Sequence, residues 1–247
     1  MSQDKNIFIT RDTQHRLVAD IKEIMKNPLT EHGIYYAHDE TDMLKGYALI
    51  IGPSETIYSD GFYLFEFFFP PNYPFSPPTL KFRTTDGLTR FHPNLYRNGK
   101  VCLSILNTWK GEQWTSCQTV RSILLTLITL FHNQPLLNEP GFTTKSKDFI
   151  PYNETIQYRN YKGSILGIVN QQHLPPLFIP FYTFIKKHFL KEYENIKKRL
   201  EDEIKKEKKE SGPKEIFVAV YQLKTIPNYE RLLHDFSTTF ETLNKLK

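Results

Sequence analysis

Four short runs rich in aromatic and branched aliphatic residues constrain the fold of this chain more than any other feature. They cover residues 34–38, 47–52, 62–69 and 79–83. Polar turns separate the first three runs, one at Asp39 and Glu40 and the next at Ser59, Asp60 and Gly61. Runs of this composition between turn residues predict strands. Because strands joined by short turns are antiparallel, we expect a four-stranded antiparallel meander.

Helical periodicity appears on both sides of this predicted sheet. Residues 11–26 place Leu17, Ile21 and Ile24 on one face, and Pro28 ends the pattern because the residue before a proline avoids helical geometry. The same spacing predicts further helices over 118–131, 181–204 and 229–246. The segment 216–223 is apolar throughout, and periodicity does not decide there between helix and strand. The pattern as a whole predicts an α+β fold.

Cys102 is the residue that points most directly to chemistry. His92, Pro93 and Asn94 precede it across a short loop that contains Gly99, and this loop favours a surface position. A thiol can take over an acyl group, and a nearby carboxamide can hydrogen-bond the oxyanion that forms. The arrangement suits acyl transfer through a covalent cysteine intermediate. The alternative is a buried thiol with a purely structural role.

Three sequence motifs, taken in order, resemble those of the ubiquitin-conjugating enzyme family. They are the proline-rich segment 70–78, the segment 92–106 followed by Trp114, and the segment 138–142. The chain length, the extra residues at 110–113 and the long tail are most similar to the enlarged ubiquitin-conjugating enzyme Z type. The resemblance covers residues 11–145 well, and beyond them it rests on a helical extension of similar size.

This resemblance implies an order of elements within the α+β fold. An N-terminal helix is followed by the four-stranded antiparallel meander, an active-site loop, a crossover helix and a helical C-terminal extension. The helix expected at 118–131 takes the place of the crossover helix. We therefore expect an N-terminal segment at 1–10, a ubiquitin-conjugating core domain at 11–149 and a mostly helical C-terminal extension at 150–247.

The resemblance also implies an acyltransferase that carries ubiquitin, or a ubiquitin-like modifier, as a thioester on Cys102. The modifier would come from an activating enzyme and pass to a substrate lysine or a ligase cysteine. In the family His92 is mainly a scaffold of the loop, and we place Pro93 with it as structural support. Asn94 is expected to be catalytic, with organisation of the loop as its alternative role. The rival reading is a catalytically inactive scaffold of the same fold.

Contacts with ubiquitin ligases are expected from three residues, namely Phe75, Ser116 and Cys117. Phe75 stands between prolines and matches a ligase-contacting position of the family, although inward packing is the alternative. Cys117 also reads as a small packing residue at the start of the crossover helix rather than a second nucleophile.

Contacts with the activating enzyme are expected from the polar face of the first helix. Arg16, Lys22 and Lys26 point away from its apolar face and suit an acidic partner domain. An ordinary solvated helix face is the equal alternative.

Composition and charge narrow the remaining classes of function. The net charge is +5, and the basic residues gather at 186–209, where interleaved glutamates favour a solvated helix over nucleic-acid binding. No apolar run approaches the roughly 18–20 residues that span a bilayer, so no membrane insertion is expected. The two cysteines and eight histidines lack zinc-ligand spacing, and no glycine-rich phosphate loop is present. We expect neither a metal nor a cofactor, since the activating enzyme would use the ATP.

A catalytic thiol requires a reducing compartment. We therefore expect the protein in the cytoplasm or nucleus, or in the host cytoplasm if a virus encodes it. The sequence leaves the identity of the modifier and of the substrates open.

Overall fold

The computed structural model describes residues 9–209, 212 and 214–245. The first half of the chain contains α1 (Arg11–Lys26), β1 (Ile34–His38), β2 (Lys45–Ile51), β3 (Phe62–Phe68), β4 (Thr79–Phe82) and α2 (Val120–Ile128). The rest contains α3 (Phe149–Arg159), α4 (Gly167–Val169), α5 (Tyr182–Lys209), β5 (Ile216–Val218), β6 (Leu223–Thr225) and α6 (Tyr229–Lys245). Of the N-terminal segment expected at 1–10, residues 1–8 lie outside the described residues.

Short helical turns complete the chain. They are η1 (Thr30–His32), η2 (Ser104–Leu106), η3 (Pro135–Asn138), η5 (Pro176–Phe181) and η6 (Ala219–Tyr221), together with the π-helical η4 (Asn160–Leu166).

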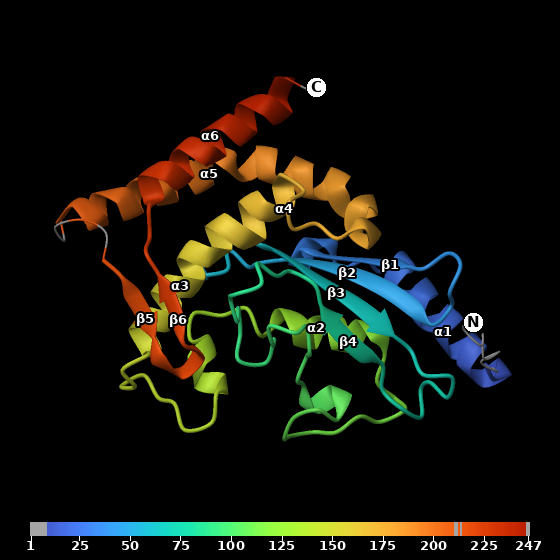
Figure 1. The fold of residues 1–247 in the computed structure, drawn as a ribbon. Coiled ribbons are helices and arrows are strands. Elements are labelled where there is room, and N and C mark those ends of the chain that lie inside the picture. The colour runs from blue at the N-terminus through green and yellow to red at the C-terminus, as the bar shows by residue number, and fades with distance from the viewer. Residues whose placement is uncertain (1–8, 210–211, 213, 246–247) are drawn as a thin grey trace, which may run out of the picture.

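Strands β1 to β4 form one antiparallel sheet in chain order, which confirms the predicted meander (Figure 1). Helix α1 has the predicted bounds. It begins after Thr10 because the Thr10 hydroxyl accepts a hydrogen bond of 3.1 Å from the backbone N–H of Thr13. The α+β class expected from the sequence is therefore the observed one.

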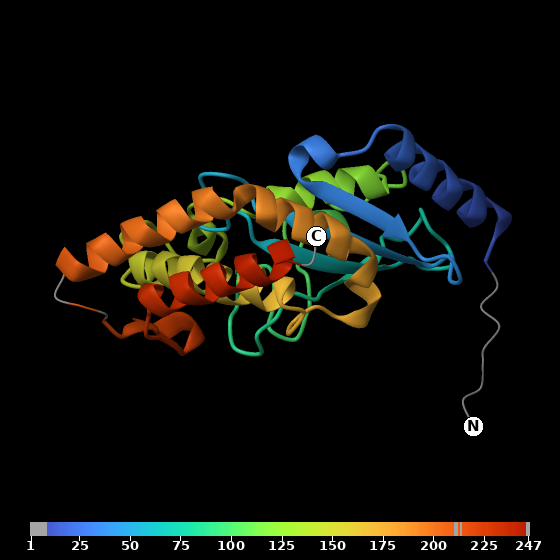
Figure 2. The same ribbon diagram turned by 90° about the horizontal axis from the view of Figure 1, so that it is seen from above.

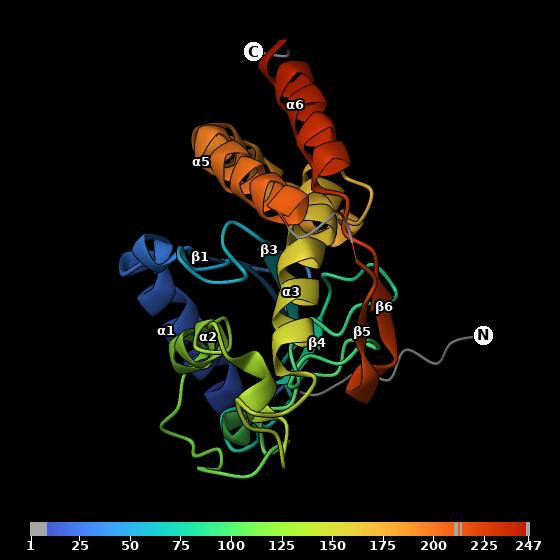
Figure 3. The ribbon, with the colours of Figure 1, turned by 90° about the vertical axis from the view of Figure 1, so that its left-hand side faces the viewer.

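Both faces of this sheet are buried. Along β2, Ala48 and Ile50 belong to the apolar cluster shared with α1 and α2, whereas Tyr47, Leu49 and Ile51 belong to the cluster shared with α5 and α6. Figures 1 and 3 show the two pairs of helices on opposite sides of the strands. This double cover explains why residues 47–51 are continuously apolar, since a sheet with one wet face would alternate with polar residues.

Helices α5 and α6 pack against each other above the sheet (Figure 2). The Tyr193 and Phe240 rings stack between them with centroids 3.9 Å apart. Helix α5 continues to Lys209 rather than ending at 204. Lys205 and Lys206 form ion pairs of 2.8 and 2.6 Å with carboxylates one turn earlier, and such pairs stabilise a helix.

Two segments of the extension have structures that the sequence did not predict. Residues 149–169, where periodicity predicts no separate helix, form one helical run through α3, η4 and α4. Pro151 lies in the first turn of α3, where a missing N–H costs no helical hydrogen bond. The undecided segment 216–223 belongs to a hairpin in which β5 pairs with β6. No helix within the described ranges is long and apolar enough to span a bilayer.

Candidate active site

The loop between β4 and α2 folds Cys102 back against Asn94. The backbone N–H of Cys102 donates to the Asn94 carbonyl over 2.9 Å, and Asn94 Nδ2 donates to the Cys102 carbonyl over 2.7 Å. The turn between them needs Gly99, whose φ is +87° and whose missing Cβ would lie 2.8 Å from the Phe82 carbonyl oxygen. The structure thus brings together the two residues that the sequence predicts to be catalytic.

The structure reverses the exposures that the sequence predicts for the two cysteines, since Cys102 is buried and Cys117 is exposed. Cys102 is only 2% exposed, because the turn ahead of it faces solvent while the cysteine lies behind that turn. Cys117 is exposed, so its interpretation as a packing residue is wrong. It lies in the short loop before Thr119, the residue that caps α2, where residues 115–117 are exposed.

These exposures predict the order in which the thiols react in the uncharged protein. A bulky maleimide should modify Cys117 at least about tenfold faster than Cys102, because a thiol must be accessible to react. Timed quenching followed by peptide mass spectrometry measures both rates, and protein unfolded in urea provides the control. Faster labelling of Cys102 in the native state would contradict its buried position.

His92 supports the loop, as the resemblance implied. It is fully buried, and its Nδ1 accepts a hydrogen bond of 3.0 Å from the backbone N–H of Asn94. Burial, followed by the nearby His132 and Arg90, holds the pKa of His92 well below its usual range, so the ring stays neutral near pH 7. A neutral imidazole that accepts through Nδ1 is placed to organise the backbone of the loop, which is the role that the resemblance predicts.

The Asn94 side chain is held at both ends. Its Nδ2 binds the Cys102 carbonyl, and its Oδ1 accepts from Asn138 Nδ2 over 3.4 Å. A carboxamide has two N–H groups, and within the described part of the chain the second one has no partner. The predicted catalytic role of Asn94 requires that this N–H reach the oxyanion. Asn138 is the last residue of η3 and the first residue of the motif 138–142. The sequence of the motif does not indicate that Asn138 contacts Asn94.

Comparison with known proteins assigns the chain to a family. The family model described as ubiquitin-conjugating enzyme matches residues 16–157, a range that includes Asn94 and Cys102. The chain belongs to the ubiquitin-conjugating enzyme family. This finding confirms the family that the three sequence motifs suggested.

The similar relatives include ubiquitin-conjugating enzymes of the Z type. The chain is 40% identical over 182 residues to ubiquitin-conjugating enzyme E2 Z of Homo sapiens, an alignment that covers 72% of this chain and 50% of the human protein. It is 44% identical over 153 residues to ubiquitin-conjugating enzyme E2 Z of Xenopus tropicalis, which covers 61% and 48% of the two chains. The chain spans about half the length of these relatives.

The expected ligase contacts lie on two loops, one with Phe75 and the other with Ser116 and Cys117, and Trp114 connects the two loops. The indole Nε1 of Trp114 donates to the Pro74 carbonyl over 2.7 Å, just before Phe75. Phe75 is 72% exposed, which excludes the inward packing considered for it. Ser116 and Cys117 follow Trp114 closely and are exposed as well. All three side chains are therefore accessible to a partner protein.

The expected docking residues on α1 do not behave alike. Arg16 Nη1 donates to the Ser116 carbonyl over 2.7 Å, and its Nε donates to the Asp20 carboxylate over 2.9 Å. Arg16 therefore ties α1 to the segment before α2 and is not a freely solvated side chain, so its predicted docking role stays a prediction. Lys22 and Lys26 are exposed, so their role in docking remains a prediction.

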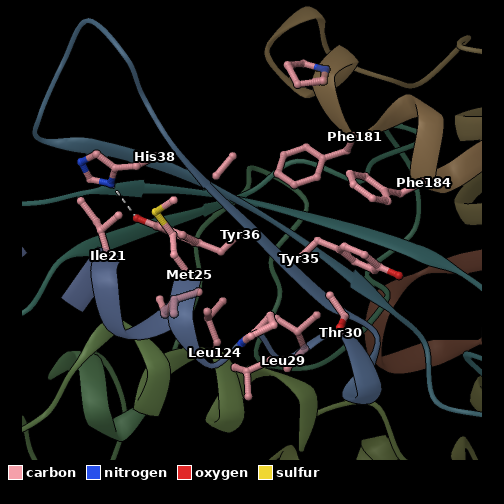
Figure 4. A pocket seen from close by; sticks show the side chains of 15 residues that line it. Ile21, Met25, Leu29, Thr30, Tyr35, Tyr36, His38, Leu124, Phe181 and Phe184 are labelled. Atoms are coloured by element: carbon pink, nitrogen blue, oxygen red, sulfur yellow. Dashed lines mark hydrogen bonds between the residues drawn. The ribbon is translucent and has the colours of Figure 1, made fainter. Parts of the chain in front are cut away.

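A groove of about 440 Å³ lies elsewhere, between α1, β1 and the start of α5. In Figure 4, Phe184 lies beside Tyr35 on one wall of the groove, where their ring centroids are 4.9 Å apart, and Leu29 and Leu124 lie at its base. None of its lining residues comes from the loop that holds Cys102, so it is separate from the candidate active site. No cluster of three or more His, Cys, Asp or Glu side chains among the described residues could hold a metal ion.

Proposed function

We propose that this chain accepts ubiquitin, or a ubiquitin-like modifier, from an activating enzyme as a thioester on Cys102. The observation that carries the proposal is the pairing of Cys102 with Asn94 through two hydrogen bonds, inside the region that matches the family model. A catalytically inactive scaffold would not need a cysteine at this position.

The chemistry proceeds in two acyl transfers. In the first, the Cys102 sulfur bonds to the C-terminal carbonyl carbon of the modifier, and the cysteine of the activating enzyme leaves with the electrons of the broken bond. In the second, a substrate lysine amine or a ligase cysteine attacks the same carbonyl, and Cys102 leaves as a thiol after a proton transfer. The protein acts as an acyltransferase and needs no cofactor, since ATP is consumed by the activating enzyme.

The partner surfaces follow from the exposed residues of the core. Phe75, Ser116 and Cys117 offer a contact to ubiquitin ligases, and Lys22 and Lys26 offer positive charge to the activating enzyme. A protein that works through a reduced thiol belongs in the cytoplasm or nucleus. Which modifier it carries is set by the activating enzyme that recognises it.

One experiment tests the proposal directly. The full chain is incubated with ATP and a panel of activating enzymes, each with its own modifier. We expect a covalent adduct that a thiol reductant removes, with at least one pair of the panel. A chain that forms no such adduct with any pair, while it remains folded, would overturn the proposal.

A further inference from the structure

The β5–β6 hairpin of the C-terminal extension reaches the active-site loop. The backbone N–H groups of Ala219 and Val220 donate to the Asp148 carboxylate over 3.0 and 2.8 Å, which fixes the hairpin on the segment before α3. Arg97 Nη2 donates to the Tyr221 carbonyl over 2.6 Å, which fixes the hairpin on the loop itself. In Figure 3 the hairpin lies beside α3 and close to the loops that follow β4. It lies outside the residues that match the family model.

The Tyr221 side chain enters this contact between the extension and the core. It is 8% exposed, and its hydroxyl donates to Glu139 Oε2 over 2.6 Å. Burial, followed by the hydrogen bond to Glu139, raises the pKa of Tyr221, so its hydroxyl remains a donor. The carboxylate of Glu139 also lies 3.6 Å from an Arg90 nitrogen. The extension therefore contacts a charged pair of the core, and Glu139 of that pair lies within the motif 138–142.

Arg90 is the link between Tyr221 and the catalytic segment. Its guanidinium carbon lies 4.7 Å from the centre of the Tyr221 ring and 3.9 Å from that of Tyr96. Its Nη2 donates to the backbone carbonyl of Pro93. A planar guanidinium stacks on aromatic rings and keeps its N–H groups in a fixed direction. The Tyr221 ring thus packs against the Arg90 guanidinium and helps to direct its N–H groups toward Pro93, the residue before Asn94.

We propose that Tyr221 is a positioning residue for the transfer from Cys102, because its ring holds Arg90 on the Pro93 carbonyl and so fixes the backbone that carries Asn94. The inference rests on the proposed function, since it concerns the rate at which the modifier leaves Cys102. A small displacement of a group that stabilises developing charge lowers this rate while leaving binding largely unchanged.

The contacts of the ring and of the hydroxyl can be separated by mutation. Tyr221→Phe removes the hydrogen bond to Glu139 and keeps the ring beside Arg90, whereas Tyr221→Ala removes both. Phe217→Ala is the matched control, because it deletes an aromatic ring from the same hairpin at a position that is 43% exposed. Arg90→Lys keeps the positive charge but loses the planar stacking group.

The test uses the full-length protein, preloaded on Cys102, and measures discharge to free lysine across a range of lysine concentrations. We expect Tyr221→Ala to lower the saturating rate about 10- to 100-fold, with little change in the lysine concentration at half rate. Tyr221→Phe should discharge at a rate within about threefold of that of the unmodified protein, since the ring is the positioning element. The amount of thioester loaded and the melting temperature are recorded for every variant.

The outcomes separate this inference from the proposed function. If the unmodified protein loads no modifier, the proposed function fails and the inference with it. If it loads and Tyr221→Ala discharges as fast as Phe217→Ala, or both slow in proportion to a lower melting temperature, only the inference is overturned. Should Tyr221→Ala not fold, Arg90→Lys decides instead, because unimpaired discharge by that variant overturns the inference and a fall of the expected size supports it.

Discussion

Replacing Cys102 with alanine is expected to abolish the adduct with the modifier, because the atom that accepts the acyl group is gone. Cys102→Ser should give a slower reaction and a different product. An alcohol is a much weaker nucleophile than a thiol near neutral pH, but the ester that it forms is more stable than a thioester. The serine adduct should therefore survive a thiol reductant and be cleaved by alkali. Gel electrophoresis with and without reductant distinguishes the two bonds.

Cys117 provides the matched control for this experiment, since it is the second cysteine of the chain and is exposed. Cys117→Ser should load as much modifier as the unmodified protein, and its adduct should be labile to reductant. Loss of loading in Cys117→Ser, with normal loading in Cys102→Ala, would show that the acyl acceptor has been assigned to the wrong cysteine.

The sheet and the first helix could be predicted from the sequence because local signals agree there. Turn residues separate the strands, and Thr10 and Pro28 bracket α1 within a clear helical pattern. Tertiary contacts then confirm what the local pattern prefers. The same applies to Cys102 and Asn94, which are eight residues apart and are joined by a turn that Gly99 permits.

The extension was harder to predict because its structure depends on distant contacts. A proline such as Pro151 breaks a helix or begins one according to its position within the turn, and the sequence does not state where that turn starts. The apolar segment 216–223 becomes part of a hairpin because it packs on α3 and on the loop near Arg97. Tyr221 and Arg90 are more than a hundred residues apart, and no local pattern relates them.

The cysteines and Arg16 show a second limit of sequence reasoning, which is the direction of a side chain in an irregular loop. A glycine turn indicates that the turn itself is exposed, but not that Cys102 behind it is. The polar face of a helix indicates that Arg16 is not in the apolar core, but backbone carbonyls of another segment can still engage it. Such contacts satisfy backbone acceptors beyond the helix, and only the fold places those acceptors.

Replacing Asn94 is expected to have the second-largest effect, on transfer rather than on loading. Asn94→Ala removes the free N–H that could donate to the oxyanion, and the loss of one such donor costs about 3–4 kcal/mol, or roughly 10²- to 10³-fold in rate. It also removes the 2.7 Å hydrogen bond to the Cys102 carbonyl, whose contribution to stability is about 1 kcal/mol. Single-turnover discharge of the preloaded protein to free lysine measures the first effect, and thermal melting measures the second.

Asn138→Ala is the control that separates these two roles of Asn94. It deletes the neighbour that donates to Asn94 Oδ1 over 3.4 Å but leaves the hydrogen bond between Asn94 and Cys102 intact. Its discharge rate should fall much less than that of Asn94→Ala, because the donor N–H is still present. If Asn94→Ala melts at a lower temperature but discharges at the normal rate, Asn94 only organises the loop. In that case the stabilisation of the oxyanion must come from another group.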